Sequence, residues 1–210
     1  MTTEDRQHIE PVLRKYAHVF HDEESNDINE NNVIDHRIIA GDSNQIRRPP
    51  YRTPYALRED MQSQVQNMLN KGIIRPSSSP WSATAILVPT KSQDDKPNFG
   101  FCVDFRALNT VTQFDPYSLP VFEETTSTLH GYKHFTVLDS YSDLWQVGIT
   151  EEHKGRTGFS VASGHYEFNR LPFGLSNSTT NFKLIEAVLK DLVGTECWVF
   201  IDIIVCSKSA

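Results

Sequence analysis

Residues 83–105 read ATAILVPTKSQDDKPNFGFCVDF, and this stretch decides the class of fold that the sequence predicts. Its two apolar runs, at 83–90 and 99–105, are rich in the residue types that favour strands. The segment between them, KSQDDKPN, is short, polar and charged. Because so short a connection suits antiparallel strands, the stretch predicts a β-hairpin with a charged tip.

The clearest predicted helix precedes this hairpin, at residues 56–71. Apolar side chains recur there at helical spacing, and Gly72 suits the left-handed turn that ends many helices. The apolar stripe consists of Leu57, Met61, Val65, Met68 and Leu69.

The other predicted elements alternate irregularly along the chain. Helices are predicted at 10–20, with Pro11 at the first helical position, at 121–130 before Gly131, and at 177–193 before Gly194. Strands are predicted at 33–39, 134–139, 145–149 and 197–207, and as a pair around Ser163-Gly164. Irregular alternation with hairpins favours an α+β fold over a doubly wound sheet.

Charge is distributed unevenly over the 210 residues, whose net charge is −7. Residues 1–44 carry net −6, residues 45–109 net +4 and residues 110–210 net −5. The basic middle segment is compatible with an ordinary solvated surface and with a surface that faces phosphates. It contains RRPPYRTPY (47–55), whose three prolines exclude a helix, so we expect this stretch to run extended over a surface.

The sequence also limits the cellular setting. Its three cysteines, an odd number with no CxxC pair, favour neither a disulfide framework nor a zinc site. No apolar run approaches the ~20 residues that span a bilayer, and the N-terminus lacks an apolar signal core. We therefore expect an intracellular protein, cytoplasmic or nuclear and not secreted, with no membrane partner.

Two carboxylates are candidates for metal chemistry. Asp139 ends the apolar run HFTVLD, and Asp202 ends WVFID. Such residues are usually solvated, but two neighbouring strand ends could bring both to one rim, where Mg²⁺ binds carboxylates together with substrate phosphates. Both interpretations stay open on spacing alone.

Two further segments could meet a nucleotide. Lys91, at the hairpin tip, is either a solvated lysine or a point charge for a triphosphate. In LPFGLSNS (171–178), Gly174 permits close backbone approach, while Ser176, Asn177 or Ser178 could cap the following helix. Residues 171–178 could both contact a nucleotide and cap the following helix.

The order of these segments resembles the reverse transcriptase of gypsy-type LTR retrotransposon Pol polyproteins. The resemblance is dense over 45–210 and loose over 10–44. It rests on IRRPPYRTPYALRED, VQNMLNKGIIRPSSSPWSA, FCVDFRALNTVTQFDPYSLP, FTVLD, WQVGI, RTGF, GHYEFNRLPFGLSNS and VFID. Together these pieces leave little room for chance.

The resemblance implies a right-hand polymerase fold. Residues 1–44 would form an N-terminal helix and an acidic linker, and 45–210 an incomplete fingers and palm. The fingers would comprise about 45–115 with part of 150–175, and the rest would form a ferredoxin-like palm. The chain would be a truncated fragment that lacks the thumb. An intact Pol polyprotein would supply the thumb, a ribonuclease H and an integrase.

The resemblance also assigns roles to single residues. Asp139 and Asp202 would be catalytic and would hold the family's two Mg²⁺ ions. Contacts to the dNTP would come from Lys91, Leu144, Phe173 and Gly174, and Arg106 would approach the template. The expected partners are an RNA or DNA template-primer and dNTPs.

Several residues depart from the family pattern. The catalytic hairpin, aromatic–X–Asp–Asp in the family, reads Phe200-Ile201-Asp202-Ile203, so one aspartate is missing. Gly100 stands where the family has an arginine, and Leu144 where it has an aromatic residue. Asp143 replaces a glycine, and Thr179 replaces a proline.

These departures fall on the chemistry, so we expect an RNA-directed DNA polymerase fragment without robust activity. The alternatives are a non-catalytic nucleic-acid-binding remnant and a non-functional pseudogene product. An aspartic protease built on Leu138-Asp139-Ser140 is disfavoured, because Tyr141 follows where a small residue is needed.

Overall fold

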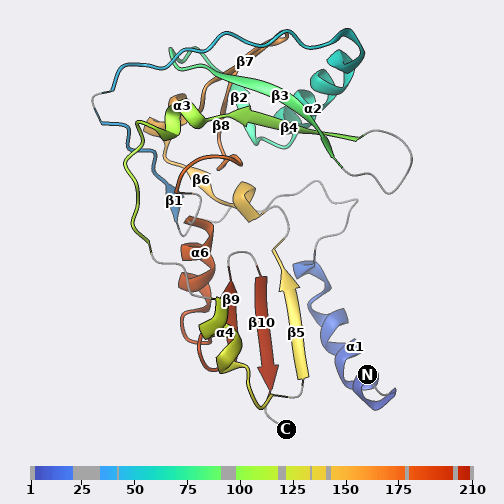
Figure 1. The fold of residues 1–210 in the computed structure, drawn as a ribbon. Helices are drawn as coiled ribbons and strands as arrows, with labels where there is room; N and C mark the ends of the chain where they lie inside the picture. Colours follow the sequence, from blue (N-terminus) through green and yellow to red (C-terminus); the bar gives the residue numbers. More distant parts are fainter. Residues whose placement is uncertain are drawn as a thin grey trace.

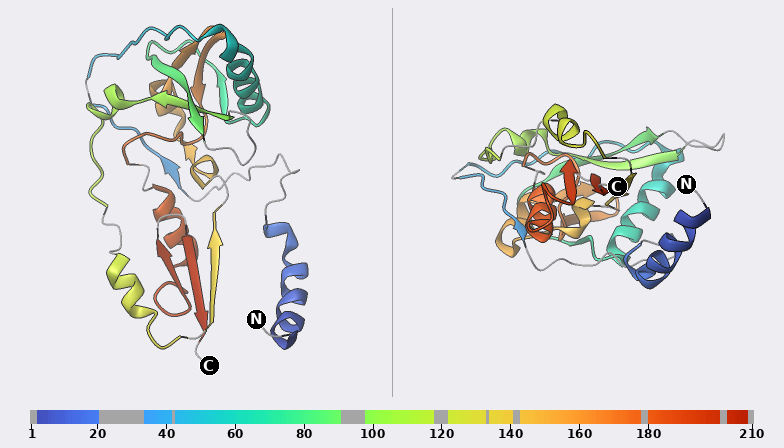
Figure 2. Two further views of the ribbon diagram at one scale, coloured as in Figure 1. Left: turned by 45° about the vertical axis from the view of Figure 1, so that its right-hand side comes forward. Right: turned by 90° about the horizontal axis from the view of Figure 1, so that it is seen from below.

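The computed structural model describes residues 3–20, 34–41, 43–90, 98–117, 122–132, 134–140, 143–177, 180–200 and 203–208. These residues form two lobes that lie end to end along the molecule (Figures 1 and 2). Each lobe has a sheet with helices packed against it, so the predicted α+β class is confirmed. None of the described helices is both long and apolar enough to cross a membrane.

The first lobe is built on a five-stranded sheet with the order β2-β8-β7-β3-β4. Its strands are β2 (Ile74–Pro76), β3 (Ala83–Thr90), β4 (Asn98–Asp104), β7 (Phe159–Val161) and β8 (Gly164–Phe168). Helix α2 (Arg58–Asn70) follows the short helix η2 (Tyr55–Leu57) and buries Met61, Val65 and Met68 in the same core as the sheet. Gly72 follows α2 with φ +64°, as its predicted role requires.

The hairpin predicted at 83–105 is present as β3 and β4. Their antiparallel register runs from Thr84 opposite Asp104 to Thr90 opposite Asn98. Its tip, with Lys91, lies outside the described residues. On its other side β3 pairs in parallel with β7, with Ala83 opposite Phe159.

The second lobe is built on the antiparallel sheet β5-β10-β9. Its strands are β5 (His134–Asp139), β9 (Cys197–Phe200) and β10 (Ile203–Lys208), and its helices are α4 (Phe122–Thr128) and α6 (Thr180–Leu189). Phe182 and Ile185 of α6 are buried against Val199. The core here is smaller, and Phe135 and Val137 of β5 are at least half exposed.

Short elements lie between and beside the two sheets. The parallel pair β1 (Asp35–His36) and β6 (Gly148–Ile149) is accompanied by η3 (Asp143–Gln146), α5 (Glu151–Lys154) and η4 (Gly155–Thr157). Helix α3 (Arg106–Asn109) follows β4. The N-terminal helices α1 (Thr3–Lys15) and η1 (Ala17–Val19) leave their described side chains exposed.

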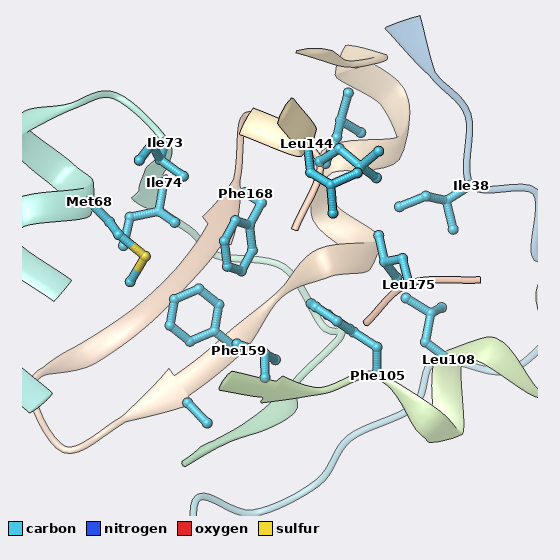
Figure 3. Close-up of a cluster of buried hydrophobic side chains, with 14 of the residues drawn as sticks. Ile38, Met68, Ile73, Ile74, Phe105, Leu108, Leu144, Phe159, Phe168 and Leu175 are labelled. Carbon is cyan, nitrogen blue, oxygen red and sulfur yellow. The ribbon is translucent and has the colours of Figure 1, made fainter. Parts of the chain in front are cut away.

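The main core gathers side chains from segments that are far apart in the sequence (Figure 3). Phe159 lies 5.2 Å from Phe168 between ring centroids, and Phe105 lies 6.2 Å from Phe168. Ile38, Leu144 and Leu175 are buried in the same cluster. This cluster joins the five-stranded sheet to β1, η3 and the loop after β8.

Two strand predictions need correction. Residues 145–149 are not one strand, because η3 extends to Gln146 and only Gly148 and Ile149 pair with β1. Within the described part of the strand predicted at 33–39, only Asp35 and His36 pair, with Gly148 and Ile149 of β6. The length of each strand is set by the partner strand available in the tertiary structure, and the apolar pattern of a segment does not predict that partner.

The helix predictions also need adjustment at their ends. α1 begins at Thr3, so Pro11 lies inside it and not at its first position. The upstream residues include the good helix formers Glu4, Arg6, Gln7 and Glu10 but lack an apolar stripe. α6 ends at Leu189, earlier than predicted, and turns follow before Gly194, whose φ is +85°.

The first prediction concerns Gly158, where β7 approaches the start of β3. A Cβ atom at this position would lie 2.2 Å from the Trp81 carbonyl oxygen, and the Gly158 carbonyl accepts a 2.7 Å hydrogen bond from the Ala83 amide. Gly158→Ala should therefore lower the free energy of unfolding by about 3 kcal/mol, because the strands must move apart. Urea denaturation measures this.

The matched control is Gly194→Ala, where a Cβ atom meets nothing within 4 Å and only the φ of +85° is unfavourable. It should cost about 1–2 kcal/mol. Equal losses for the two variants would contradict the close approach at Gly158.

The second prediction concerns pH and His36, which is 2% exposed. Burial, followed by the charge of Lys183, lowers the pKa of His36 to about 4. The unfolded chain binds a proton there below about pH 6.5 while the folded chain does not. The free energy of unfolding should therefore fall by up to about 3 kcal/mol between pH 6.5 and pH 4.

Urea titrations at a series of pH values test this expectation. His36→Gln should flatten the slope between pH 6.5 and 4, whereas His130→Gln, at an exposed position, should not. A slope that survives in the His36 variant would assign the pH dependence to other groups.

Candidate active site

The loop after β8 presents Phe173 on the surface. Its neighbours Leu171 and Leu175 are 0% and 5% exposed, whereas Phe173 is 56% exposed. Between them Gly174 takes φ +89°, a conformation that favours glycine. Two buried leucines thus anchor the loop and leave the Phe173 ring available to a ligand.

Two asparagine side chains tie this loop to the segment after β4. Asn109 of α3 donates through Nδ2 to the Gly174 carbonyl oxygen (2.9 Å) and accepts through Oδ1 from the Ser176 amide (2.8 Å). Asn177 donates to the Gln113 carbonyl oxygen and accepts from the Asp115 amide. Together these bonds hold residues 174–177 against residues 109–115.

Sequence reasoning missed both asparagines as positioning groups. It considered Asn177 as a helix cap; in the structure the Asn177 side chain bonds to Gln113 and Asp115, and its φ is +67°. Asparagine adopts a positive φ more readily than most residues do, and this preference is the only local feature of the sequence that could have indicated the role of Asn177. Nothing in the local sequence indicated the role of Asn109, because its hydrogen-bond partners lie some 65 residues away along the chain.

A cavity of about 300 Å³ lies beside Phe173. It is mostly apolar, and it opens between α2, β4 and the loop after β8. Its lining includes Gln64, Met68, Gly100, Cys102, Trp145 and Phe173. The Trp145 and Phe173 rings meet edge to face with centroids 6.1 Å apart. The structure therefore brings Gly100 and Phe173, two positions singled out from the sequence, to one cavity.

Gly100 leaves room in this cavity. A Cβ atom there would lie 3.2 Å from Thr90 Cγ2, a tight contact with a side chain on the paired strand. Nearby, Gln64 Nε2 donates to the Phe99 carbonyl oxygen at 2.7 Å and fixes α2 to β4. A larger residue at position 100 therefore requires a small shift of Thr90.

Leu144 lies elsewhere. It is 8% exposed and belongs to the main core, where Figure 3 shows it near Phe168. Its neighbour Trp145 lines the cavity instead. The contact of Leu144 with a nucleotide sugar stays a prediction.

Asp139 stands at the end of β5 with its side chain exposed. It pairs with Ile203, the first residue of β10, and Ile203 also pairs with Phe200, the last residue of β9. The end of β5 therefore lies beside the facing ends of β9 and β10. Asp202 and Lys91 are outside the described residues, among which no cluster of three potential metal ligands occurs.

Arg106 projects from the start of α3 and pairs with Asp104. Its Nε and Nη2 donate to the two Asp104 carboxylate oxygens at 2.8 and 2.7 Å. These bonds, helped by the Arg106 amide, lower the pKa of Asp104 to about 2. The Arg106 side chain is 87% exposed, so a cation stands at the surface in a fixed orientation.

Comparison with known proteins assigns the family. A family model for the reverse transcriptase (RNA-dependent DNA polymerase) matches residues 91–210. This chain belongs to the reverse transcriptase family. It is 39% identical over 160 residues to the retrovirus-related Pol polyprotein from transposon opus of Drosophila melanogaster, covering 74% of this chain and 16% of the relative.

Other relatives agree. The Pol polyprotein from the Drosophila transposon gypsy is 34% identical over 175 residues, which cover 82% of this chain and 17% of the relative. The enzymatic polyprotein of Cauliflower mosaic virus (strain NY8153) is 31% identical over 167 residues, 80% of this chain and 25% of the relative. The chain thus spans about a sixth of the length of the Drosophila relatives, and the predicted link to gypsy-type Pol polyproteins is confirmed.

Solved structures share the fold. Prototype foamy virus protease-reverse transcriptase superposes with a TM-score of 0.85 at 21% identity, over 100% of this chain and 28% of that one. The foamy viral protein in complex with an RNA/DNA hybrid gives the same TM-score at 20% identity, with the same coverage. The five-stranded lobe is accordingly named the fingers and the three-stranded lobe the palm.

The third prediction tests the asparagine contacts of the fingers. Asn109→Ala removes the acceptor of the Ser176 amide and the donor to Gly174, so residues 171–177 should exchange amide hydrogens about tenfold faster. Hydrogen exchange read by mass spectrometry measures this. Asn70→Ala is the control, because the Asn70 side chain accepts a hydrogen bond from the exposed Gln66 side chain on the same helix. Unchanged exchange in the Asn109 variant would show that packing alone holds the loop.

Proposed function

We propose that this chain is the fingers-and-palm part of an RNA-directed DNA polymerase from a retrotransposon Pol polyprotein. The proposed reaction is nucleotidyl transfer: a primer 3′-hydroxyl attacks the α-phosphate of a dNTP and expels pyrophosphate. The observation that carries the proposal is the strand register that places Asp139 beside Ile203 and Phe200, the facing ends of β10 and β9, between which Asp202 stands in the sequence. Membership of the reverse transcriptase family supports it.

In this proposal Asp139 and Asp202 are the catalytic carboxylates and would hold divalent cations. Exposed carboxylates suit a hard cation such as Mg²⁺, which takes its remaining ligands from water and substrate phosphates. When bound, such ions would stabilise the attacking and leaving oxygens. The exposed position of Asp139 at a strand end is compatible with this role.

The nucleotide and template would contact other residues of the fingers. The Phe173 ring and the Gly174 backbone offer a surface for the dNTP, with Lys91 as a charge for its triphosphate and Leu144 toward its sugar. The cavity between Gly100 and Phe173 lies beside this surface. Arg106, held by Asp104, offers an exposed cation for a template phosphate.

We further propose that catalysis is impaired. The hairpin sequence Phe200-Ile201-Asp202-Ile203 has one aspartate where the family has two. One carboxylate fewer would leave the second metal ion poorly held. Gly100, with no side chain in the cavity, would weaken dNTP binding without affecting the metal ligands.

The fourth prediction ranks these lesions. Inserting one Asp directly after Asp202 should raise primer extension by about 10²–10³-fold, the usual effect of one electrostatic element at a reacting centre. Gly100→Arg should recover less. Leu144→Phe should recover least, because overpacking the core at Leu144 costs about 1–3 kcal/mol of stability.

The assay is single-nucleotide extension of a labelled primer with Mg²⁺, with the chain fused to a thumb from an intact relative. Asp139→Asn in the inserted background is the negative control and should abolish extension. Activity restored by Gly100→Arg alone, with no effect of the insertion, would overturn this account of the site.

A further inference from the structure

Cys197 of β9 and Cys206 of β10 stand directly opposite each other in the palm sheet, where the two strands lie side by side (Figure 1). The antiparallel register runs from Phe200 opposite Ile203 to Cys197 opposite Cys206. Residues directly opposite on antiparallel strands point to the same face of the sheet. Strand register therefore brings two of the chain's three thiols together.

The backbone hydrogen bonds of Cys197 show which kind of antiparallel pair this is. The Cys197 amide donates to the Leu192 carbonyl oxygen at 3.1 Å, and the Cys197 carbonyl oxygen accepts from the Gly194 amide at 2.9 Å. Both groups are thus used on the side away from β10. This is the non-hydrogen-bonded kind of pair, whose Cα atoms are about 4.5 Å apart and whose side chains lie closest. A disulfide spans Cα separations of about 4.4–6.8 Å, so this pair has a spacing that the bond accepts.

The two thiols lie on the face of the sheet that the palm helices cover. Val199 and Ile204 form the next cross-strand pair on that face, two residues along each strand. Val199 is 4% exposed and packs in the cluster with α6, and Ile204 packs against the same cluster. Close packing of these neighbours limits how far the Cys197 and Cys206 side chains can move apart.

The two cysteines differ in accessibility. Cys197 is 2% exposed, whereas Cys206 is partly exposed. Burial raises the pKa of the Cys197 thiol, and the next contribution comes from Cys206, so the two groups are within electrostatic reach of each other. Thiol–disulfide exchange starts at a thiolate that the oxidant can reach. Cys206 is therefore the thiol that reacts first with a soluble disulfide.

The third cysteine is separate from this pair. Cys102 lies on β4 in the fingers, it is exposed, and the residue opposite it on β3 is Ile86. Cys102 thus provides an internal reference for an accessible thiol that has no cysteine across the strand.

We propose that Cys197 and Cys206 form a redox modification site, at which a small-molecule disulfide such as oxidised glutathione converts the two thiols into an intramolecular cross-strand disulfide. The Cys206 thiolate attacks one sulfur of the oxidant, forms a mixed disulfide and releases one glutathione. The Cys197 thiolate then attacks the Cys206 sulfur and releases the second glutathione. The chain gives up two protons and two electrons, which reduce the oxidant to two thiols.

The bond constrains the part of the palm that carries Asp202 in its sequence. It links β9 to β10 at the end of their pairing that is opposite to Phe200 and Ile203, so the two strands can neither separate nor slip in register. The modification itself does not rest on the proposed polymerase activity. Its consequence for a catalytic carboxylate does.

The experiment incubates the full, reduced chain with oxidised glutathione, blocks the remaining thiols by alkylation in urea and identifies the products by mass spectrometry. Cys197 and Cys206 should be joined to each other with no glutathione on either, while Cys102 is free or carries one glutathione. Cleavage before Asp202 separates the two cysteines in the sequence, so the resulting fragments should stay joined until a reductant is added.

Three variants complete the test. Cys102→Ser is the matched control and should form the bond at the rate of the parent. Cys197→Ala should stop at a glutathione adduct on Cys206. Cys206→Ala should leave the buried Cys197 at least about tenfold slower to react than Cys206 is in the parent. Stable glutathione adducts on Cys206 of the parent, without the cross-link, would overturn the proposal.

A second measurement separates strand register from mere closeness in the sequence, because two cysteines this near also meet in an unfolded chain. In glutathione buffers at equilibrium, the folded chain should become half oxidised at an oxidant level at least about tenfold lower than the chain in concentrated urea. Equal oxidant levels in the two conditions would show that the palm does not favour the bond, which contradicts the proposal.

Hydrogen exchange tests the constraint on the hairpin. The oxidised chain should exchange the amide hydrogens of β9 and β10 about tenfold more slowly than the reduced chain, with α2 unchanged. Equal exchange in the two forms would overturn the constraint. Asp139→Asn should form the bond like the parent, so a failure of the polymerase proposal and a failure of this one are distinguishable.

Discussion

The contact among Phe105, Phe159 and Phe168 is the interaction on which the rest of this structure depends. All three rings are at most 3% exposed, and they come from the end of β4, from β7 and from β8. Because protein interiors are close-packed, these rings determine where β4 stops and α3 begins. The position of Asn109, four residues after Phe105, follows from that.

Hydrogen bonds from Asn109 then position the loop of the candidate active site. The Asn109 side chain holds Gly174 and Ser176, and the buried Leu171 and Leu175 fix the loop from below. Phe173 and Gly174 then form the part of the loop that stays exposed. A rigid scaffold that presents a few exposed groups is the usual basis of a binding site.

The palm is organised differently, and this bears on Asp139. Its core is small, and the edge strand β5 leaves Phe135 and Val137 at least half exposed. Asp139 therefore depends on strand register with β10 more than on packing. Regions with few buried contacts open more readily, so we expect the palm to be the less stable lobe in this chain.

Local patterns were sufficient for helix α2, the β3–β4 hairpin and strand β5, because apolar periodicity and turn residues act within a few residues of each other. They also singled out Asp139, whereas Gly100 and Phe173 were singled out by the resemblance to reverse transcriptases. Local patterns could not place Leu144 in the core, limit the 145–149 segment to Gly148 and Ile149, or reveal Asn109 as a clamp. The last two outcomes depend on partners at least 65 residues away, and a contact at that separation leaves no periodic pattern in the sequence.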